Sequence, residues 1–127
     1  MKTMTLEEYR AAILAQGVPV EHRAFRCPVC GTVQSAADFL KAGLKDLDEV
    51  EKYLGFSCVG RFTGAGPFNK YKKGVNPGRG CDWTLGGLFG LQNLEVEHEG
   101  KRYPRFEVAT PEEALEHMKR NTAEQAA

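Results

Sequence analysis

The sequence has no long apolar segment, no export signal and no excess of charge of either sign. Its apolar residues never form the run of about 18 that a transmembrane helix needs. Residues 1–10, MKTMTLEEYR, lack the apolar core of a secretory signal. Seventeen basic and seventeen acidic residues cancel, which argues against a strongly basic nucleic-acid-binding protein and against an acidic disordered tail. We therefore expect a cytoplasmic protein that makes no membrane contact.

The chain contains what one folded domain requires. Its 127 residues are too few for two domains of ordinary size, and 42% of them are hydrophobic against 27% charged. No internal repeat or domain boundary is visible, so residues 1–127 are expected to form a single domain. The mixture of helix and strand patterns predicts the α+β class, with a short antiparallel sheet and flanking helices.

Capping residues and apolar spacing predict helices at four places. They are expected over residues 6–16, between Ser35 and Gly43, from Leu47 to Gly55, and after Thr110, with a frayed tail at about 121–127.

Strands are predicted over residues 20–26 and in a hairpin formed by residues 91–98 and 101–109. The intervening residues 99–100, Glu-Gly, suit a two-residue hairpin turn, which fixes the register of the two strands. Pro104 lacks a backbone N–H, so it restricts the second strand to an edge position or requires a bulge.

Residues 56–90 form a glycine-rich segment that differs from the rest of the chain. Ten of the fourteen glycines lie between Gly55 and Gly90, and no acidic residue occurs from Phe56 to Cys81. So glycine-rich a stretch is expected to be irregular. An irregular segment of this length is usually anchored, functional or mobile.

The four cysteines predict a metal site. A CPxCG turn places two thiolates about 4 Å apart, as Zn–S bonds of roughly 2.3 Å require, and its glycine tolerates a left-handed backbone. Two further cysteines occur singly, each beside glycine or within the glycine-rich segment, where the chain can turn sharply. In a reducing compartment, metal binding is favoured over disulfides. The predicted ligands of a structural Zn²⁺ in a ribbon- or knuckle-like centre are Cys27, Cys30, Cys58 and Cys81.

Other interpretations of the same cysteines stay open: four scattered core thiols, a redox-active CxxC, or a site that includes histidine. Four thiolates on one ion would leave no position for water, which argues against zinc-dependent hydrolysis. Three residues are expected to surround the metal and its ligands: Asp82, Trp83 and Arg61.

Positive charge is concentrated in the glycine-rich segment and is interleaved with aromatic residues. Basic groups neutralise phosphates and aromatic rings stack on bases, so the pattern fits a surface for nucleic acid or another acidic partner. The alternative is a solvated loop whose aromatic side chains pack inward. The candidate binding residues are Arg61, Lys70, Lys72, Lys73, Arg79, Phe68 and Tyr71.

Three blocks of the sequence are similar to a small family of uncharacterised phage and prophage proteins. The blocks are FRCPVCGxxQ from Phe25 to Gln34, CVGR from Cys58 to Arg61, and GCDWTxGGLF from Gly80 to Phe89. The resemblance covers most of residues 1–117. It implies a phage or prophage source and four shared cysteine ligands, but it implies no reaction.

These observations favour a non-enzymatic, zinc-stabilised binding module, an accessory protein that acts on a host protein or on nucleic acid. The alternative function is that of an enzyme, either a thiol-redox protein that uses the CxxC or a phosphodiester-acting protein that uses the glycine-rich basic segment. Four cysteines on zinc would favour the module, whereas a Cys27–Cys30 pair without metal would favour the enzyme.

Overall fold

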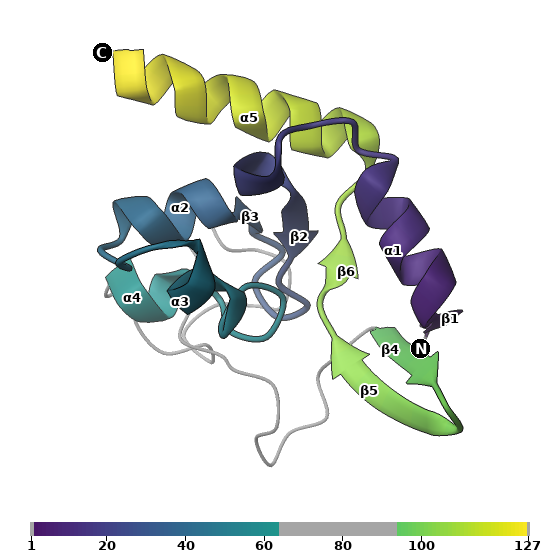
Figure 1. The fold of residues 1–127 in the computed structure, drawn as a ribbon. Helices are drawn as coiled ribbons and strands as arrows, with labels where there is room; N and C mark the ends of the chain where they lie inside the picture. Colours follow the sequence, from purple (N-terminus) through teal and green to yellow (C-terminus); the bar gives the residue numbers. More distant parts are fainter. Residues whose placement is uncertain (1, 64–93, 127) are drawn as a thin grey trace.

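The computed structural model describes residues 2–63 and 94–126, and these confirm the α+β class (Figure 1). Along the chain the elements are β1 (Lys2–Thr5), α1 (Leu6–Leu14), the 3₁₀ helix η1 (Val20–His22), β2 (Ala24–Arg26), β3 (Val33–Ser35), α2 (Ala36–Lys41), α3 (Leu47–Glu51), α4 (Gly60–Thr63), β4 (Leu94–His98), β5 (Lys101–Arg105), β6 (Glu107–Val108) and α5 (Pro111–Ala126).

The strands of the described part form two small sheets, with the orders β1-β4-β5 and β3-β2-β6. All pairings are antiparallel except one, because β1 runs parallel to β4 with Lys2 beside Leu94. The expected antiparallel pairing is thus present, and β1 adds one parallel pairing that was not predicted. The four-residue stretch KTMT gave no strand signal of its own, since its pairing partner lies some 90 residues away.

The predicted hairpin is present, and its register agrees with the two-residue turn. Val96 lies opposite Tyr103 and Glu97 opposite Arg102. Both turn residues adopt a positive φ, as a type I′ turn requires. Pro104 lies in β5, at the edge of its sheet, where a missing N–H leaves no partner unsatisfied.

Two of the predicted strands are shorter than expected. The segment 101–109 divides at Phe106: β5 stays in the hairpin, whereas β6 pairs with β2 in the other sheet. Phe106 is fully buried and its N–H donates to Gly55 O at 3.1 Å, which draws the chain away from β4. Residues 20–26 likewise are not one strand, because the three residues after Pro19 form η1.

The predicted helix starts are confirmed by their caps. Thr5 Oγ1 accepts a hydrogen bond from the N–H of Glu8, whose side chain accepts one from the N–H of Thr5. Thr110 and Glu113 repeat this pattern at the start of α5. Two features differ from the expectation. α4 forms inside the segment that was expected to be irregular. α5 continues to Ala126, past residue 121 where the tail was expected to fray, so fraying of the tail stays a prediction.

The two longest helices pack on different sheets (Figure 1). α5 crosses over β2, β3 and η1, whereas α1 packs beside β1 and β4. Beneath α5 the packing is close, since the buried residues there are Ala24, Ala109 and Ala114. In the described part of the chain no helix is long and apolar enough to cross a membrane.

The buried side chain of Gln16 joins three segments. Its Nε2 donates to Ala24 O at 2.8 Å and to Ala109 O at 2.9 Å, and its Oε1 accepts from Ala24 N at 2.9 Å. One amide therefore fixes the end of α1 against the start of β2 and against the segment that leads into α5. Gln16 is 5% exposed, so water cannot replace these bonds easily.

Gln16→Leu, which keeps the volume of the side chain but removes its hydrogen bonds, should lower the free energy of unfolding by about 2–4 kcal/mol, because buried backbone groups lose their partners. Urea unfolding measures this. Arg10→Leu on the exposed face of α1 is the control and should change stability by less than about 0.5 kcal/mol. Equal stabilities of Gln16→Leu and wild type would contradict the role of the amide.

A second polar contact fastens α5 to α2. His117 Nε2 lies 2.6 Å from Asp38 Oδ2, which also accepts from Ser35 N at 2.7 Å. Burial alone would raise the pKa of Asp38, but the hydrogen bond and charge of His117, the N–H of Ser35 and the amide of Asn121 together lower it below its ordinary value. The folded state therefore favours the ionised carboxylate.

Because the pKa of Asp38 is lowered by folding, its stabilising contribution is complete above the ordinary carboxyl pKa of about 3.9 and is lost as the pH falls through the lower folded value. Asp38→Asn should thus make the melting temperature fall less steeply below about pH 4 than in wild type. Asp48→Asn, at an exposed position on α3, should keep the wild-type slope. Parallel curves for wild type and Asp38→Asn would contradict the assignment.

Candidate metal centre

The β2–β3 hairpin presents the CPVC turn. Arg26 pairs with Val33, so that the six residues between them form a closed loop. Within it Gly31 N donates to Cys27 O at 2.9 Å and Cys27 N donates to Thr32 O at 3.0 Å. Gly31 has a φ of +75°, the left-handed conformation that the CPxCG pattern predicted at this position. These bonds fix where the first two cysteine side chains start.

The third cysteine comes from the turn between α3 and α4. Ser57 N donates to Tyr53 O at 2.8 Å, and Arg61 N donates to Cys58 O at 3.1 Å, so the chain is hydrogen-bonded on both sides of Cys58. Gly55, with a φ of +83°, lies against Tyr9 and Phe25. This close contact places the turn next to β2, and therefore beside the CPVC loop.

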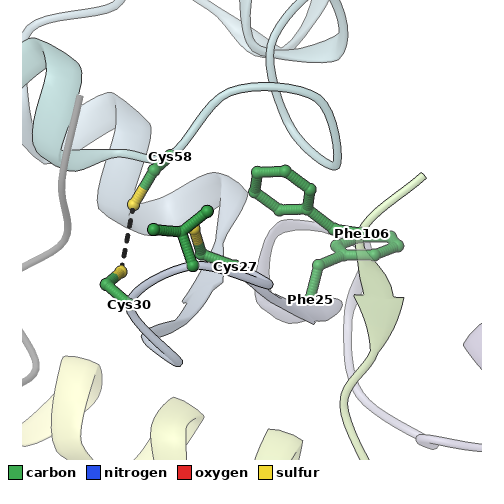
Figure 2. Close-up of a cluster of buried hydrophobic side chains, with 6 residues drawn as sticks. Phe25, Cys27, Cys30, Cys58 and Phe106 are labelled. Carbon is green, nitrogen blue, oxygen red and sulfur yellow. Dashed lines mark hydrogen bonds between the residues drawn. The ribbon is translucent and has the colours of Figure 1, made fainter. Parts of the chain in front are cut away.

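Cys27, Cys30 and Cys58 meet in the interior (Figure 2). Their sulfur atoms all lie within 4.8 Å of one another, and the three residues are 0%, 2% and 0% exposed. The Sγ atoms of Cys30 and Cys58 are 3.7 Å apart, too far for a disulfide bond of about 2.05 Å. Two Zn–S bonds of about 2.3 Å at a tetrahedral angle would separate the sulfurs by about 3.8 Å. The three-cysteine cluster therefore has the geometry of a metal site.

Among the described residues, the polar side chains of Gln34 and Thr32 contact the sulfurs, and neither contact was predicted. Gln34 Nε2 lies 3.3 Å from Cys58 Sγ and donates to it, while Gln34 Oε1 accepts from Val59 N at 2.8 Å. Thr32 Oγ1 lies 3.1 Å from Cys30 Sγ; it accepts from the thiol and would donate to a thiolate. Gln34 is fully buried, and its Nε2 also donates to Thr32 O at 3.4 Å, so both ends of its amide are held in the interior. The one hint of Gln34 in the sequence was its place at the end of the FRCPVCGxxQ block, and no role was assigned to it there.

Apolar side chains enclose the rest of the cluster. Phe25, Val29 and Phe106 are buried with the three cysteines, and Tyr9, Ile13, Leu54 and Val108 pack around them. Such a wall keeps water away and strengthens the bonds between thiolates and a cation. The same burial keeps the three thiols of the described part from the solvent, where a redox-active thiol meets its substrate.

Of the remaining predicted site residues, Arg61 lies in the described part of the chain and the others lie outside it. Arg61 lies on α4, three residues after Cys58, and is exposed. Its neighbour Phe62 packs against Phe39 and Tyr53, with ring centroids 5.7 Å and 4.8 Å apart, as the inward-packing alternative expects for an aromatic residue of this segment. Outside the described residues lie Cys81, Asp82, Trp83, Lys70, Lys72, Lys73, Arg79, Phe68 and Tyr71.

Comparison with known proteins places the chain in a family without giving it an activity. No curated protein matches the sequence significantly. No solved structure matches it either. The sequence model of one family, described as VVA0879-like, matches residues 5–109, a stretch that includes all four cysteines. Because the match covers most of the chain, the protein belongs to the VVA0879-like family.

Proposed function

We propose that the protein is a zinc-stabilised, non-enzymatic binding module. The observation that carries this proposal is the convergence of three buried cysteine sulfurs from two distant turns. Soft thiolate ligands in tetrahedral geometry favour Zn²⁺ among the common ions of cells. An ion at this point would tie the CPVC loop to the turn before α4 from inside the core.

The hydrogen-bond donors around the sulfurs support metal binding over a cluster of ordinary core thiols. A neutral thiol is a weak acceptor and needs no amide donor, whereas a thiolate is stabilised by one. Gln34 places its Nε2 against Cys58, and Thr32 brings a hydroxyl to Cys30. Both contacts fit anionic sulfur, the form in which cysteine binds metal.

We further propose Cys81 as the fourth ligand. Structural zinc sites are nearly always four-coordinate, and three sulfurs fill three positions. With Cys81 bound, the ion would hold both ends of the 22 residues between Cys58 and Cys81. Structural zinc can contribute on the order of 10–16 kcal/mol to folding, enough to support a glycine-rich segment that has few apolar side chains.

The proposed binding surface is the basic segment that this ion would hold. Five positive charges and no negative charge lie between Phe56 and Cys81, in a chain whose formal net charge is zero. Arg61, the member of this group that the structure describes, is exposed beside the metal centre. We propose a nucleic acid as the partner, and, in line with the resemblance to phage proteins, a host nucleic acid in a phage or prophage setting.

Each of Cys27→Ser, Cys30→Ser, Cys58→Ser and Cys81→Ser should weaken zinc binding by more than the roughly 10–100-fold that loss of an outer partner causes, because each removes a direct bond to the ion. Metal analysis of the purified protein should give one Zn²⁺ per chain, and competition with a chelator measures the affinity.

Val59→Ala is the matched control for the cysteine variants. Val59 is buried beside Cys58, so its truncation should lower the melting temperature without lowering the zinc content. Full zinc content and wild-type affinity in Cys81→Ser would exclude Cys81 as a ligand. If the wild-type protein contains no metal when purified and is nevertheless fully folded, the metal centre as a whole is excluded.

The binding surface is tested by changing Lys70, Lys72 and Lys73 together to Ala. If these lysines contact phosphates, affinity for single-stranded and duplex DNA or RNA should fall for all sequences, and its dependence on salt should become shallower. Fluorescence anisotropy at two salt concentrations measures both. Changing the exposed Lys45, Lys52 and Lys101 to Ala removes the same charge from the described part and should have little effect. Absence of binding by wild type at low salt would exclude nucleic acid and leave a protein partner.

A further inference from the structure

A cavity of about 220 Å³ opens between α1 and the β4–β5 hairpin, on the sheet that does not carry the CPVC turn. Val96 pairs with Tyr103 across the hairpin, so alternate residues of both strands share the face that lines it. α1 packs against β1 and β4 and leaves the face of β5 more open. The lining residues are Leu6 and Tyr9 from α1, Val96 and His98 from β4, and Tyr103 and Arg105 from β5.

Most of the cavity wall is apolar. Val96 is 3% exposed, and Leu6 and Tyr9 are half-buried. Tyr103 stays 37% exposed, although it is a large aromatic side chain. An apolar cavity of about 150 Å³ is large enough to bind benzene, so this one has room for an aromatic ring with a short side chain. The two tyrosine rings offer flat surfaces on which such a ring can pack.

Arg105 brings a positive charge to this apolar cavity. Its guanidinium carbon lies 4.4 Å from the ring centroid of Phe56 and 5.5 Å from that of Tyr103. Nη1 donates to Pro104 O at 2.7 Å, which uses one of the five N–H groups of the side chain. Within residues 2–63 and 94–126 no carboxylate forms an ion pair with Arg105. Its charge is therefore held by aromatic rings and one carbonyl group.

The other cavity residues do not neutralise this charge. Burial raises the pKa of Tyr9 to about 12, so its phenol is uncharged at neutral pH. Burial also lowers the pKa of Arg105, against the opposing effect of the hydroxyl groups of Tyr9 and Tyr103. A guanidinium nevertheless stays protonated in proteins. The cavity thus contains a fixed, partly desolvated positive charge and no negative group in its wall.

The backbone of β5 is poorly suited to adding an extended peptide at this edge. In a hairpin with a two-residue turn, the β5 residues whose backbone groups face away from β4 are Arg102 and Pro104. Pro104 has no N–H, and its carbonyl oxygen already accepts from Arg105 Nη1. The cavity therefore suits a small molecule better than a strand of another chain.

We propose that this cavity binds a small aromatic carboxylic acid, whose ring packs among Tyr9, Val96 and Tyr103 and whose carboxylate pairs with the Arg105 guanidinium. The planar arrangement of the guanidinium N–H groups matches the two oxygens of a carboxylate. Burial beside aromatic rings strengthens such a pair, because water competes less for both partners. The site uses neither the metal centre nor the basic segment, so it goes beyond the function proposed above.

Titration of the full-length protein with three probes at constant ionic strength tests the proposal. Phenylacetate carries both the ring and the charge, phenylacetamide keeps the ring alone, and acetate keeps the charge alone. In ¹H–¹⁵N spectra, phenylacetate should shift the backbone amide signals of Val96 and Tyr103 with saturation in the millimolar range or below. The other two probes should bind at least about 10-fold more weakly. No saturable shift with phenylacetate, or equal binding of either partial probe, would overturn the proposal.

Variants on the two faces of β5 decide whether the named groups are responsible. Arg105→Gln should weaken phenylacetate binding about 10-fold or more, because it removes the charge. Tyr103→Ala changes a partly exposed side chain and should weaken phenylacetate but not acetate. Arg102→Gln removes the same charge from the opposite face of the strand and should bind as wild type does. Wild-type affinity in Arg105→Gln, or equal weakening in Arg102→Gln, would overturn the site. Zinc content should stay unchanged in all three, so failure of this site and failure of the metal centre are distinguishable.

Discussion

Three cysteine sulfurs meet in the interior between a loop of the β2–β3 hairpin and the turn before α4, and most of the described structure is arranged around that meeting point. Phe25 and Phe106, which pack on the cluster, also bring β2 and β6 together. Gly55, with a φ of +83°, supplies the left-handed backbone of the turn that leads to Cys58 beside Tyr9 and Phe25. A cation among three thiolates would turn mutual repulsion into attraction, so the packing of this core depends on how the sulfurs are satisfied.

Buried side-chain amides connect elements that apolar packing alone would hold loosely. In the described part the strands have between two and five residues and four of the five α-helices have nine or fewer, so each contributes little apolar surface. Gln16 links α1, β2 and the segment before α5, and Gln34 links β3 to Cys58 and Val59. Each amide both donates and accepts, so one side chain specifies the relative position of two or three segments.

The metal centre and the candidate binding surfaces have different physical roles. The three cysteines are buried among apolar side chains, a setting that suits a structural rather than an exposed metal site. Arg61, on α4 three residues after Cys58, is exposed. Its N–H donates to Cys58 O at 3.1 Å, so the turn that carries this cysteine also positions the exposed arginine.

The sequence by itself determined the local features of this protein. Caps at Thr5 and Thr110, the hairpin turn at residues 99–100 and the left-handed Gly31 depend on neighbouring residues, and all four were predicted. Cysteine chemistry also predicted that Cys27, Cys30 and Cys58 would converge, because few other arrangements use a CxxC and distant single cysteines. Only the tertiary structure decided the parallel pairing of β1, the transfer of β6 to the second sheet, and the contact of His117 with Asp38. Those contacts join residues that are about 80 to 90 positions apart, so they depend on how the elements pack and leave no mark in the local pattern of residues.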